Sequence, residues 1–514
     1  TALKAAETLR SFGKEDGITC PADASPQAIA ELMRVREMTA RAALSPALER
    51  MRAEMFYAAS GGGVKSGKAT ADMKDLKRVV ILGGGPCGGC ALHQLVHIHA
   101  GFHVTIVDTK EYYEDTPCIL RLMAGNDADH LWKNITIPFA DIIRDAKNAE
   151  FICGTAAAVR KDHVLVGTTN GVASRVVPFD YLILSTGSFY QSDIKTEGAS
   201  IAHRKESFAM ERERMAEVDN FSVVGAGLVG IQMACELRHY FPEKEVNVYT
   251  RAGGWLPRVP EAHGHLHEEC TKQGVKLIMG EEIVSTDADG RMVTKKGKKL
   301  GPAGARTYWC TGYKPNNSYI KDSRTDADIA SELDEGGFVK VDKANRMNAD
   351  KGLGHIFAGG DLACAFVHNQ GERTAAGAAM HAGVIVQNIL LAAGKREGGL
   401  KQAAINFFAG TDLEVSLGPK AGMLYATNPA FESFFKDPEA LKAKYGPMLE
   451  SGRKGWQEIA YGGIEDMGCV NWMMFSMIPD GFAKMLKEDD MTIWGMFMDP
   501  AIIDLTFPVA DEKN

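Results

Sequence analysis

The segment RVVILGGGPCGG, residues 78–89, decides the fold that the sequence predicts. Its apolar first half, 78–82, has the length and the β-branched residues of a buried strand. A helix-forming segment follows at 90–96, and a second strand at 103–107 ends at Asp108. The order strand, G-x-G-x-x-G, helix, strand and acid therefore predicts a dinucleotide-binding βαβ unit.

Each part of this unit has a physical role. Gly83 allows the tight turn, Gly85 lets the backbone approach a pyrophosphate, and Gly88 lets helix and strand pack closely. The helix N-terminus offers unpaired N–H groups to the phosphates, and Asp108 accepts hydrogen bonds from ribose hydroxyls. A glycine-rich loop without a ligand is the alternative. The predicted residues of this first site are Gly83, Gly85, Pro86, Gly88 and Asp108.

The same pattern occurs a second time. An apolar strand at 220–224 leads into a loop with Gly225, Gly227 and Gly230, a helix to residue 240, and a strand at 245–249. Two such units in one chain predict two nucleotides. We expect an α/β fold with two Rossmann-like domains and helical extensions at both ends.

The residues after the last of these strands bear on the choice of nucleotide. Thr250 stands where the first unit has Asp108, and Arg251 follows it. A carboxylate at this position favours NADH, whereas a hydroxyl and a guanidinium suit the 2′-phosphate of NADPH. The interpretation favours NADPH; the alternative is that Arg251 is a solvated surface arginine.

Composition limits the classes of function. The chain has 514 residues, 45% hydrophobic and 24% charged, which is ordinary for a globular protein of about three domains. A net charge of −8 disfavours nucleic-acid binding. Ten irregularly spaced cysteines predict reduced thiols, and no apolar run is long enough for a membrane-spanning helix. A start at Thr1 fits a chain trimmed of a targeting peptide, although a fragment would look the same.

Three further segments carry a family resemblance. They are FDYLILSTGS at 179–188, WCTGYKP at 309–315 and HIFAGGD at 355–361. Together with the two glycine loops, they resemble the two-dinucleotide flavoprotein reductases. The resemblance implies that Thr186 and Gly187 mark the crossing between the FAD and NAD(P)H domains. It also implies that Gly360 and Asp361 contact the ribityl chain and pyrophosphate of FAD.

Within this group the chain is most similar to ferroptosis-suppressor-type and apoptosis-inducing-factor-like NAD(P)H:quinone oxidoreductases, relatives of the type II NADH dehydrogenases. The similar segments are 107–121, 241–246, 380–382 and 416–422. The implied domains are 1–76, a helical extension with a linker; 77–215, the first part of the FAD domain; 216–315, the NAD(P)H domain; 316–395, the second part of the FAD domain; and 396–514, a C-terminal region and extension.

The resemblance implies an activity and four candidate catalytic residues. Hydride passes from NADPH or NADH to FAD, and electrons pass to a quinone. Cys118 lies where the family lines the flavin pocket, and His381 matches a family histidine, although it could equally be a core histidine. Gln232 replaces the family's nicotinamide-orienting glutamate, and Arg373 replaces its paired lysine.

Two other chemistries are disfavoured. Thiol reductases need two cysteines beside the flavin, but residues 111–125 hold only Cys118, and Cys87 and Cys90 lie within the phosphate loop. The histidines of AHGHLH at 262–267 lack a second cluster, so a surface turn is favoured over a metal site.

The sequences of the two extensions leave the partners and the cellular location of the protein open. Met- and aromatic-rich segments after residue 450 suggest packing, a protein partner or a membrane face. We expect peripheral membrane association in a plastid or mitochondrion. The alternative function is a weakly active, FAD-containing structural subunit of a respiratory or photosynthetic complex, which Gln232, Arg373 and the extensions support.

Overall fold

The structure of the protein is a computed structural model. It describes residues 76–99, 101–125, 132, 135–144, 146–167, 173–192, 194–195, 200–257, 259–363, 375–401, 413–419, 421–425 and 464–466. The predicted N-terminal helices, the linker, Arg373 and most of the C-terminal extension lie outside these residues.

The first parallel sheet has five strands in the order β19-β9-β1-β2-β5. Side chains of β1 alternate between two cores: Val79 and Ile81 face helices α4 and α12, whereas Val80 and Leu82 face the opposite side. Both faces are covered, which explains the continuous apolar run in the sequence. These elements are β1 (Lys77–Leu82), β2 (Phe102–Asp108), β5 (Ala149–Cys153), β9 (Tyr181–Leu184), β19 (Ile356–Ala358), α4 (Pro86–His93), its π-helical continuation η2 (Gln94–Ile98) and α12 (Ala375–Ala392).

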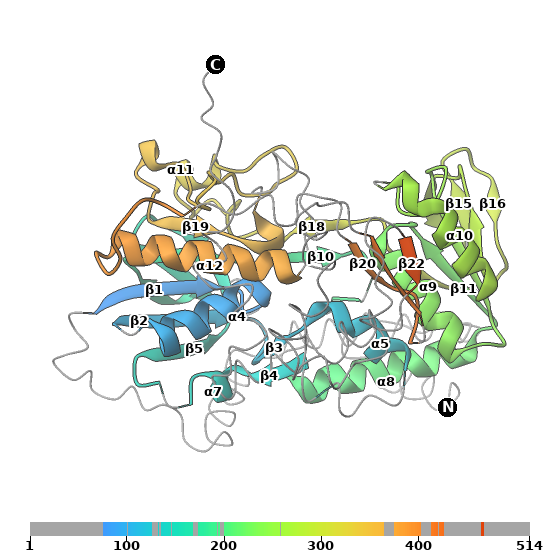
Figure 1. Ribbon diagram of the computed structural model, residues 1–514, viewed down its shortest axis with the longest axis horizontal. Helices are drawn as coiled ribbons and strands as arrows, with labels where there is room; N and C mark the ends of the chain where they lie inside the picture. The colour runs from blue at the N-terminus through green and yellow to red at the C-terminus, as the bar shows by residue number, and fades with distance from the viewer. Residues whose placement is uncertain are drawn as a thin grey trace, which may run out of the picture. The chain divides into compact units, whose positions relative to one another are not determined.

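The second parallel sheet has the order β13-β12-β11-β17. Helix α9 packs on β11 and β12, and α10 packs on β13, so this unit repeats the architecture of the first (Figure 1). Its elements are β11 (Asn220–Val224), β12 (Glu245–Tyr249), β13 (Val275–Ile278), β17 (Arg306–Trp309), α9 (Leu228–Tyr240), η4 (Pro260–Ala262) and α10 (His263–Lys272), with an antiparallel sheet of β14 (Ile283–Thr286), β15 (Met292–Thr294) and β16 (Lys299–Leu300).

Two short antiparallel strands join the two sheets, β10 (Ser188–Tyr190) and β18 (Tyr313–Pro315). The chain leaves the first unit through β10 and returns through β18. The two connecting strands are therefore hydrogen-bonded to each other. The remaining elements are β3 (Tyr112–Glu114), η3 (Thr116–Cys118), α5 (Ile119–Ala124), β4 (Thr136–Pro138), α7 (Phe139–Ile142), β6 (Thr155–Val159), β7 (His163–Gly167), β8 (Ala173–Pro178), α8 (Ile201–Glu217), α11 (Ala327–Ala330), η5 (Ala349–Lys351), η6 (Gly360–Leu362), β20 (Leu413–Ser416), β21 (Gly422–Tyr425) and β22 (Ile464–Asp466).

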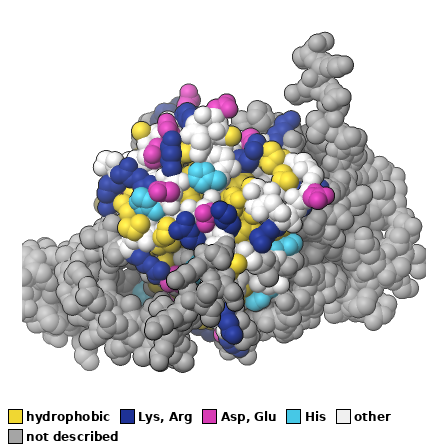
Figure 2. Space-filling model, turned by 90° about the vertical axis from the view of Figure 1, so that its left-hand side faces the viewer, with side chains coloured by type: hydrophobic (Ala, Val, Ile, Leu, Met, Phe, Trp, Pro, Cys, Tyr) yellow, Lys and Arg dark blue, Asp and Glu magenta, His cyan; other side chains and the backbone are white. Residues whose placement is uncertain are grey.

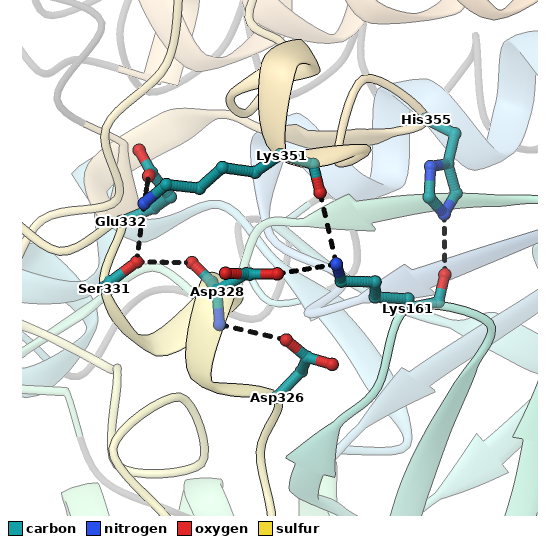
Figure 3. Close-up of polar contacts among 7 residues, drawn as sticks. All are labelled: Lys161, Asp326, Asp328, Ser331, Glu332, Lys351 and His355. Carbon is teal, nitrogen blue, oxygen red and sulfur yellow. Dashed lines mark hydrogen bonds and ion pairs between the residues drawn. The ribbon is translucent and has the colours of Figure 1, made fainter.

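A polar network fastens the turn between β6 and β7 to α11 and η5 (Figure 3). Lys161 Nζ donates to Asp328 Oδ2 at 2.6 Å and to the carbonyl oxygen of Lys351 at 3.2 Å. Lys351 Nζ lies 2.6 Å from Glu332 Oε1. The two bonds of Lys161 thus join the two stretches of chain that flank the second sheet.

One face of the molecule shows how its surface charges are distributed (Figure 2). On this face the described Lys and Arg side chains are interspersed with Asp, Glu and His, without a large patch of one sign. In the described part of the chain, no helix is long and apolar enough to cross a membrane.

The predicted α/β fold with two Rossmann-like units is confirmed. The surface turn predicted at 262–267 is wrong, since α10 begins at His263. Leu266 and Cys270 of α10 are buried in the core, and this packing outweighs the local preference of the glycine and histidines. The domain boundaries given above stay a prediction.

Candidate functional site

The first glycine loop forms an open cradle at the carboxyl edge of the first sheet. A Cβ on Gly88 would lie 1.8 Å from the Gly83 carbonyl oxygen, and one on Gly83 would lie 2.4 Å from that of Ser185. Gly83 also has φ +92°, which other residues rarely adopt. A Cβ on Gly85, by contrast, would meet nothing within 4 Å. The loop is therefore packed tightly on its protein side and open on its outer side.

The groups around this cradle suit a pyrophosphate and a ribose. Gly85 is the N-cap of α4 and no side chain caps the helix, so its first N–H groups are available to an anion. Asp108 Oδ2 accepts from Gly84 N at 2.6 Å, and its Oδ1 accepts from Lys110 N at 2.8 Å. These bonds orient the carboxylate, and each oxygen keeps a lone pair for a hydroxyl group.

The second glycine loop has the same geometry. A Cβ on Gly230 would lie 1.9 Å from the Gly225 carbonyl oxygen, and one on Gly225 would lie 2.4 Å from that of Cys310. Gly227, the N-cap of α9, faces open space and α9 also lacks a side-chain cap. The two cradles fit two dinucleotides equally well.

Thr250 and Arg251 lie at the end of β12, beside the second cradle. Gly225 N donates to the carbonyl oxygen of Tyr249, the residue before Thr250, at 2.8 Å. The buried Thr250 accepts from Ala252 N at 3.1 Å through Oγ1. Arg251 is exposed, and within the described part of the chain no acidic group pairs with its guanidinium.

The predicted crossing residues hold the two connections together. Thr186 Oγ1 donates to the carbonyl oxygen of Asn316 at 2.8 Å, and Asn316 Nδ2 donates back to that of Thr186 at 3.0 Å. Gly187 has φ +68° and accepts from Asn316 N at 2.9 Å. Thr186 and Gly187 thus lie at the junction of the two units.

The Gly360–Asp361 turn follows β19, whose carboxyl end shares the edge of the first sheet with Gly83 and Asp108. Gly360 has φ +64°, and its N–H donates to His381 Nδ1 at 3.0 Å. His381, on α12, is 2% exposed. The bond with Gly360 joins α12 to the turn that carries Asp361, and the catalytic role of His381 stays a prediction.

Of the other predicted catalytic residues, Gln232 lies on the second turn of α9 and is half-buried. Within the described residues, no protein group bonds its amide. One turn later, Glu236 accepts two bonds from Arg121 of α5, at 2.8 and 3.0 Å. Arg121 thereby links the helix that carries Gln232 to the first unit. Arg373 lies outside the described residues.

The cysteines form no accessible redox pair among the described residues. Burial raises the pKa of Cys87 to about 12 and that of Cys90 well above its ordinary value. Cys118 is fully buried, and burial raises its pKa strongly as well. Cys118 therefore remains a neutral thiol in the core. The described residues also contain no cluster of His, Cys, Asp and Glu able to hold a metal ion.

Two features were missed from the sequence. Lys195 donates to Asp361, and the buried Asp115 leaves its Oδ1 without a hydrogen-bond partner. Burial, and then the charge of Glu114, raise the pKa of Asp115 to about 7. No local signal marks either residue, since both depend on contacts between distant segments.

Comparison with known proteins identifies the family. The chain belongs to the pyridine nucleotide-disulphide oxidoreductases, whose family pattern matches residues 77–383, more than half of its length. It is an oxidoreductase that uses FAD and a nicotinamide dinucleotide. The open cradles and carboxylates described above fit these two cofactors.

Individual relatives are distant. Human ferroptosis suppressor protein 1 is 26% identical over 329 residues, covering 61% of this chain and 80% of the relative. Apoptosis-inducing factor 1 of Saccharomyces cerevisiae is 24% identical over 298 residues, covering 56% and 74%. These matches confirm the resemblance inferred from the motifs.

Solved structures share the fold. The sulfide:quinone oxidoreductase of Aquifex aeolicus superposes with a TM-score of 0.59 at 13% identity, covering 84% of this chain and 96% of that one. A NAD-dependent persulfide reductase from A. fulgidus has a TM-score of 0.52 at 18% identity, covering 69% and 65%. At these identities the likeness concerns architecture alone.

Proposed function

We propose that this protein transfers hydride from a nicotinamide dinucleotide, NADPH in preference to NADH, to FAD and passes the electrons to a quinone. The observation that carries the proposal is the pair of matching glycine cradles, one on each parallel sheet, connected by the β10–β18 crossing. FAD supplies the redox chemistry when bound, accepting two electrons from one partner and releasing them to the other.

The protein's own residues bind the FAD and orient it. In this proposal Gly85 and the N-terminus of α4 hold the FAD pyrophosphate, and Asp108 holds the ribose. Asp361 accepts a hydrogen bond from the ribityl chain. The N-terminal end of α12, which follows Asp361 in the chain, favours negative charge on the reduced ring.

The second cradle orients the nicotinamide dinucleotide. Gly227 and α9 receive its pyrophosphate, while Thr250 and Arg251 receive the 2′-phosphate. The Gln232 amide can donate to and accept from the nicotinamide carboxamide, so it serves as a neutral orienting group. Arg373 is its proposed partner from outside the described residues.

A quinone is the favoured acceptor because the chain resembles the ferroptosis-suppressor type of oxidoreductase. Electron transfer to a cysteine pair is not supported, because Cys87, Cys90 and Cys118 are buried and burial raises the pKa of each thiol. A lipid quinone would be met at a membrane surface, and we propose peripheral association in an organelle.

The test is a reoxidation experiment. The enzyme is reduced anaerobically with one equivalent of NADPH and then mixed with a short-chain ubiquinone, or with an aromatic disulfide as the control acceptor. We expect the quinone to restore the oxidised flavin spectrum at least tenfold faster than the disulfide. Equal rates, or a faster disulfide, would refute the quinone assignment.

One observation favours a second function. Gln232 stands where the resembled reductases carry a glutamate, which fits a weakly active structural subunit that keeps FAD. That function predicts a flavin spectrum that neither NADPH nor NADH bleaches. Under the same function, the variant Gln232→Glu would gain flavin reduction.

A further inference from the structure

A line of alternating charges runs from the Asp361 turn to helix α8. Lys195 Nζ lies 3.1 Å from Asp361 Oδ2. At the other end, Arg204 Nε lies 2.9 Å from Glu114 Oε2. Burial alone would raise the pKa of Glu114, but the charges of Lys110, Arg204 and Lys195 hold it below its ordinary value. Lys195 therefore acts electrostatically on both carboxylates, Asp361 and Glu114.

The buried end of this line fixes the position of Lys195. Arg204 is 0% exposed, and its guanidinium lies over the ring of Phe208, 4.3 Å from the centroid. Its Nη2 donates to the carbonyl oxygen of Ile194 at 2.9 Å. Ile194 directly precedes Lys195, so a rigid buried arginine anchors the backbone from which the lysine extends.

At the other end of the line, one carboxylate oxygen of Asp361 is left available to a ligand. Ser188 Oγ donates to Asp361 Oδ2 at 2.6 Å, and Lys195 Nζ bonds the same oxygen and also lies 2.9 Å from Ser188 Oγ. Within the described residues, no protein group bonds Asp361 Oδ1. The side chains of Lys195 and Asp361 are each 22% exposed, so a ligand can reach them.

We propose that Lys195 is a positioning residue for FAD: it fixes Oδ2 of Asp361 so that Oδ1 faces a hydroxyl group of the ribityl chain. This inference rests on the proposed role of Asp361. Without the ammonium group, Asp361 keeps a single hydrogen bond from Ser188 and rotates more freely. Ordering the carboxylate then becomes a cost of binding FAD.

The experiment measures the dissociation constant of FAD by fluorescence titration of the apoprotein. Lys195→Met should weaken FAD binding about tenfold, the size expected for losing one partly exposed charge-assisted hydrogen bond. Lys195→Arg should bind within about threefold of the wild type. Lys314→Met is the matched control, because Lys314 is an exposed lysine on the neighbouring strand β18 without a described partner.

If Lys195 only stabilised the fold, its replacement would lower the stability of the apoprotein as well as FAD binding. We expect the midpoint of thermal unfolding of the Lys195→Met apoprotein to stay within about 2 °C of the wild type. The double variant Lys195→Met/Asp361→Asn should bind FAD as weakly as Asp361→Asn alone, because Lys195 acts through Asp361.

Two results overturn the inference separately from the proposed function. If Asp361→Asn weakens FAD binding and Lys195→Met does not, the positioning role is refuted while the FAD site stands. If the two substitutions add fully in the double variant, Lys195 does not act through Asp361. If Asp361→Asn binds FAD like the wild type, the proposed FAD site itself is refuted.

Discussion

Replacing Gly227 by alanine tests the second cradle without disturbing the fold. The added Cβ would meet no protein atom within 4 Å, and Gly227 has φ −84° and ψ −175°, which alanine adopts readily. The methyl group would occupy the space from which the pyrophosphate approaches α9. Loss of one charge-assisted hydrogen bond costs about 1.5–3 kcal/mol, so the NAD(P)H dissociation constant should rise about 10- to 150-fold.

The assay separates binding from stability. NADPH affinity is measured by equilibrium titration, FAD content by absorbance and stability by chemical unfolding. FAD content should stay unchanged, and the free energy of unfolding should stay equal or rise by up to about 1 kcal/mol, because alanine restricts the unfolded chain. Gly264→Ala is the control, since its Cβ on α10 also meets no protein atom within 4 Å.

The matching change in the first cradle, Gly85→Ala, should instead weaken FAD binding. Unchanged NADPH affinity in Gly227→Ala would refute the assignment of the second cradle. Loss of FAD in the same variant would show that the two cradles are not separate sites.

Three more predictions follow from single residues. Arg251→Ala should weaken NADPH binding about tenfold and NADH binding less than about twofold; equal losses in the two titrations would exclude a 2′-phosphate contact. Asp115 has a pKa raised to about 7, so its protonated form favours the folded state. The contribution of Asp115 to the free energy of unfolding is fully present below about pH 4 and falls by about 1.4 kcal/mol per pH unit as the pH rises to about 7. Asp115→Asn should therefore exceed the wild type in free energy of unfolding at pH 8 and match it at pH 4; a difference independent of pH would contradict this. Arg121→Met should lower the free energy of unfolding by about 3 kcal/mol, because the buried Glu236 carboxylate loses its ion pair with Arg121. It should also slow flavin reduction in stopped flow, and an unchanged rate would show that this pair does not position α9.

Local patterns predicted the parts of the site that lie within one βαβ unit. Gly83, Gly88 and Asp108 fall within 26 residues of sequence, and their spacing alone predicts the geometry of the loop. The same holds for Gly225 and Gly230. Their close contacts across the loop arise because a strand, a tight turn and a helix leave no room for a Cβ.

Contacts between distant segments were not predictable. Lys195 and Asp361 are 166 residues apart, and Arg204 and Glu114 are 90 apart. Neither pair leaves a periodic pattern in the sequence, because each joins segments that only the tertiary fold brings together. His381 is similar: its family match suggested chemistry, whereas its bond to Gly360 is visible only in the fold.

An anaerobic spectral titration shows whether NADPH or NADH reduces the FAD of this protein. The purified holoprotein is titrated with NADPH and, separately, with NADH while the flavin absorbance is recorded. We expect one equivalent of NADPH to bleach the flavin band fully and faster than NADH does. A flavin band that neither nucleotide bleaches would contradict this expectation.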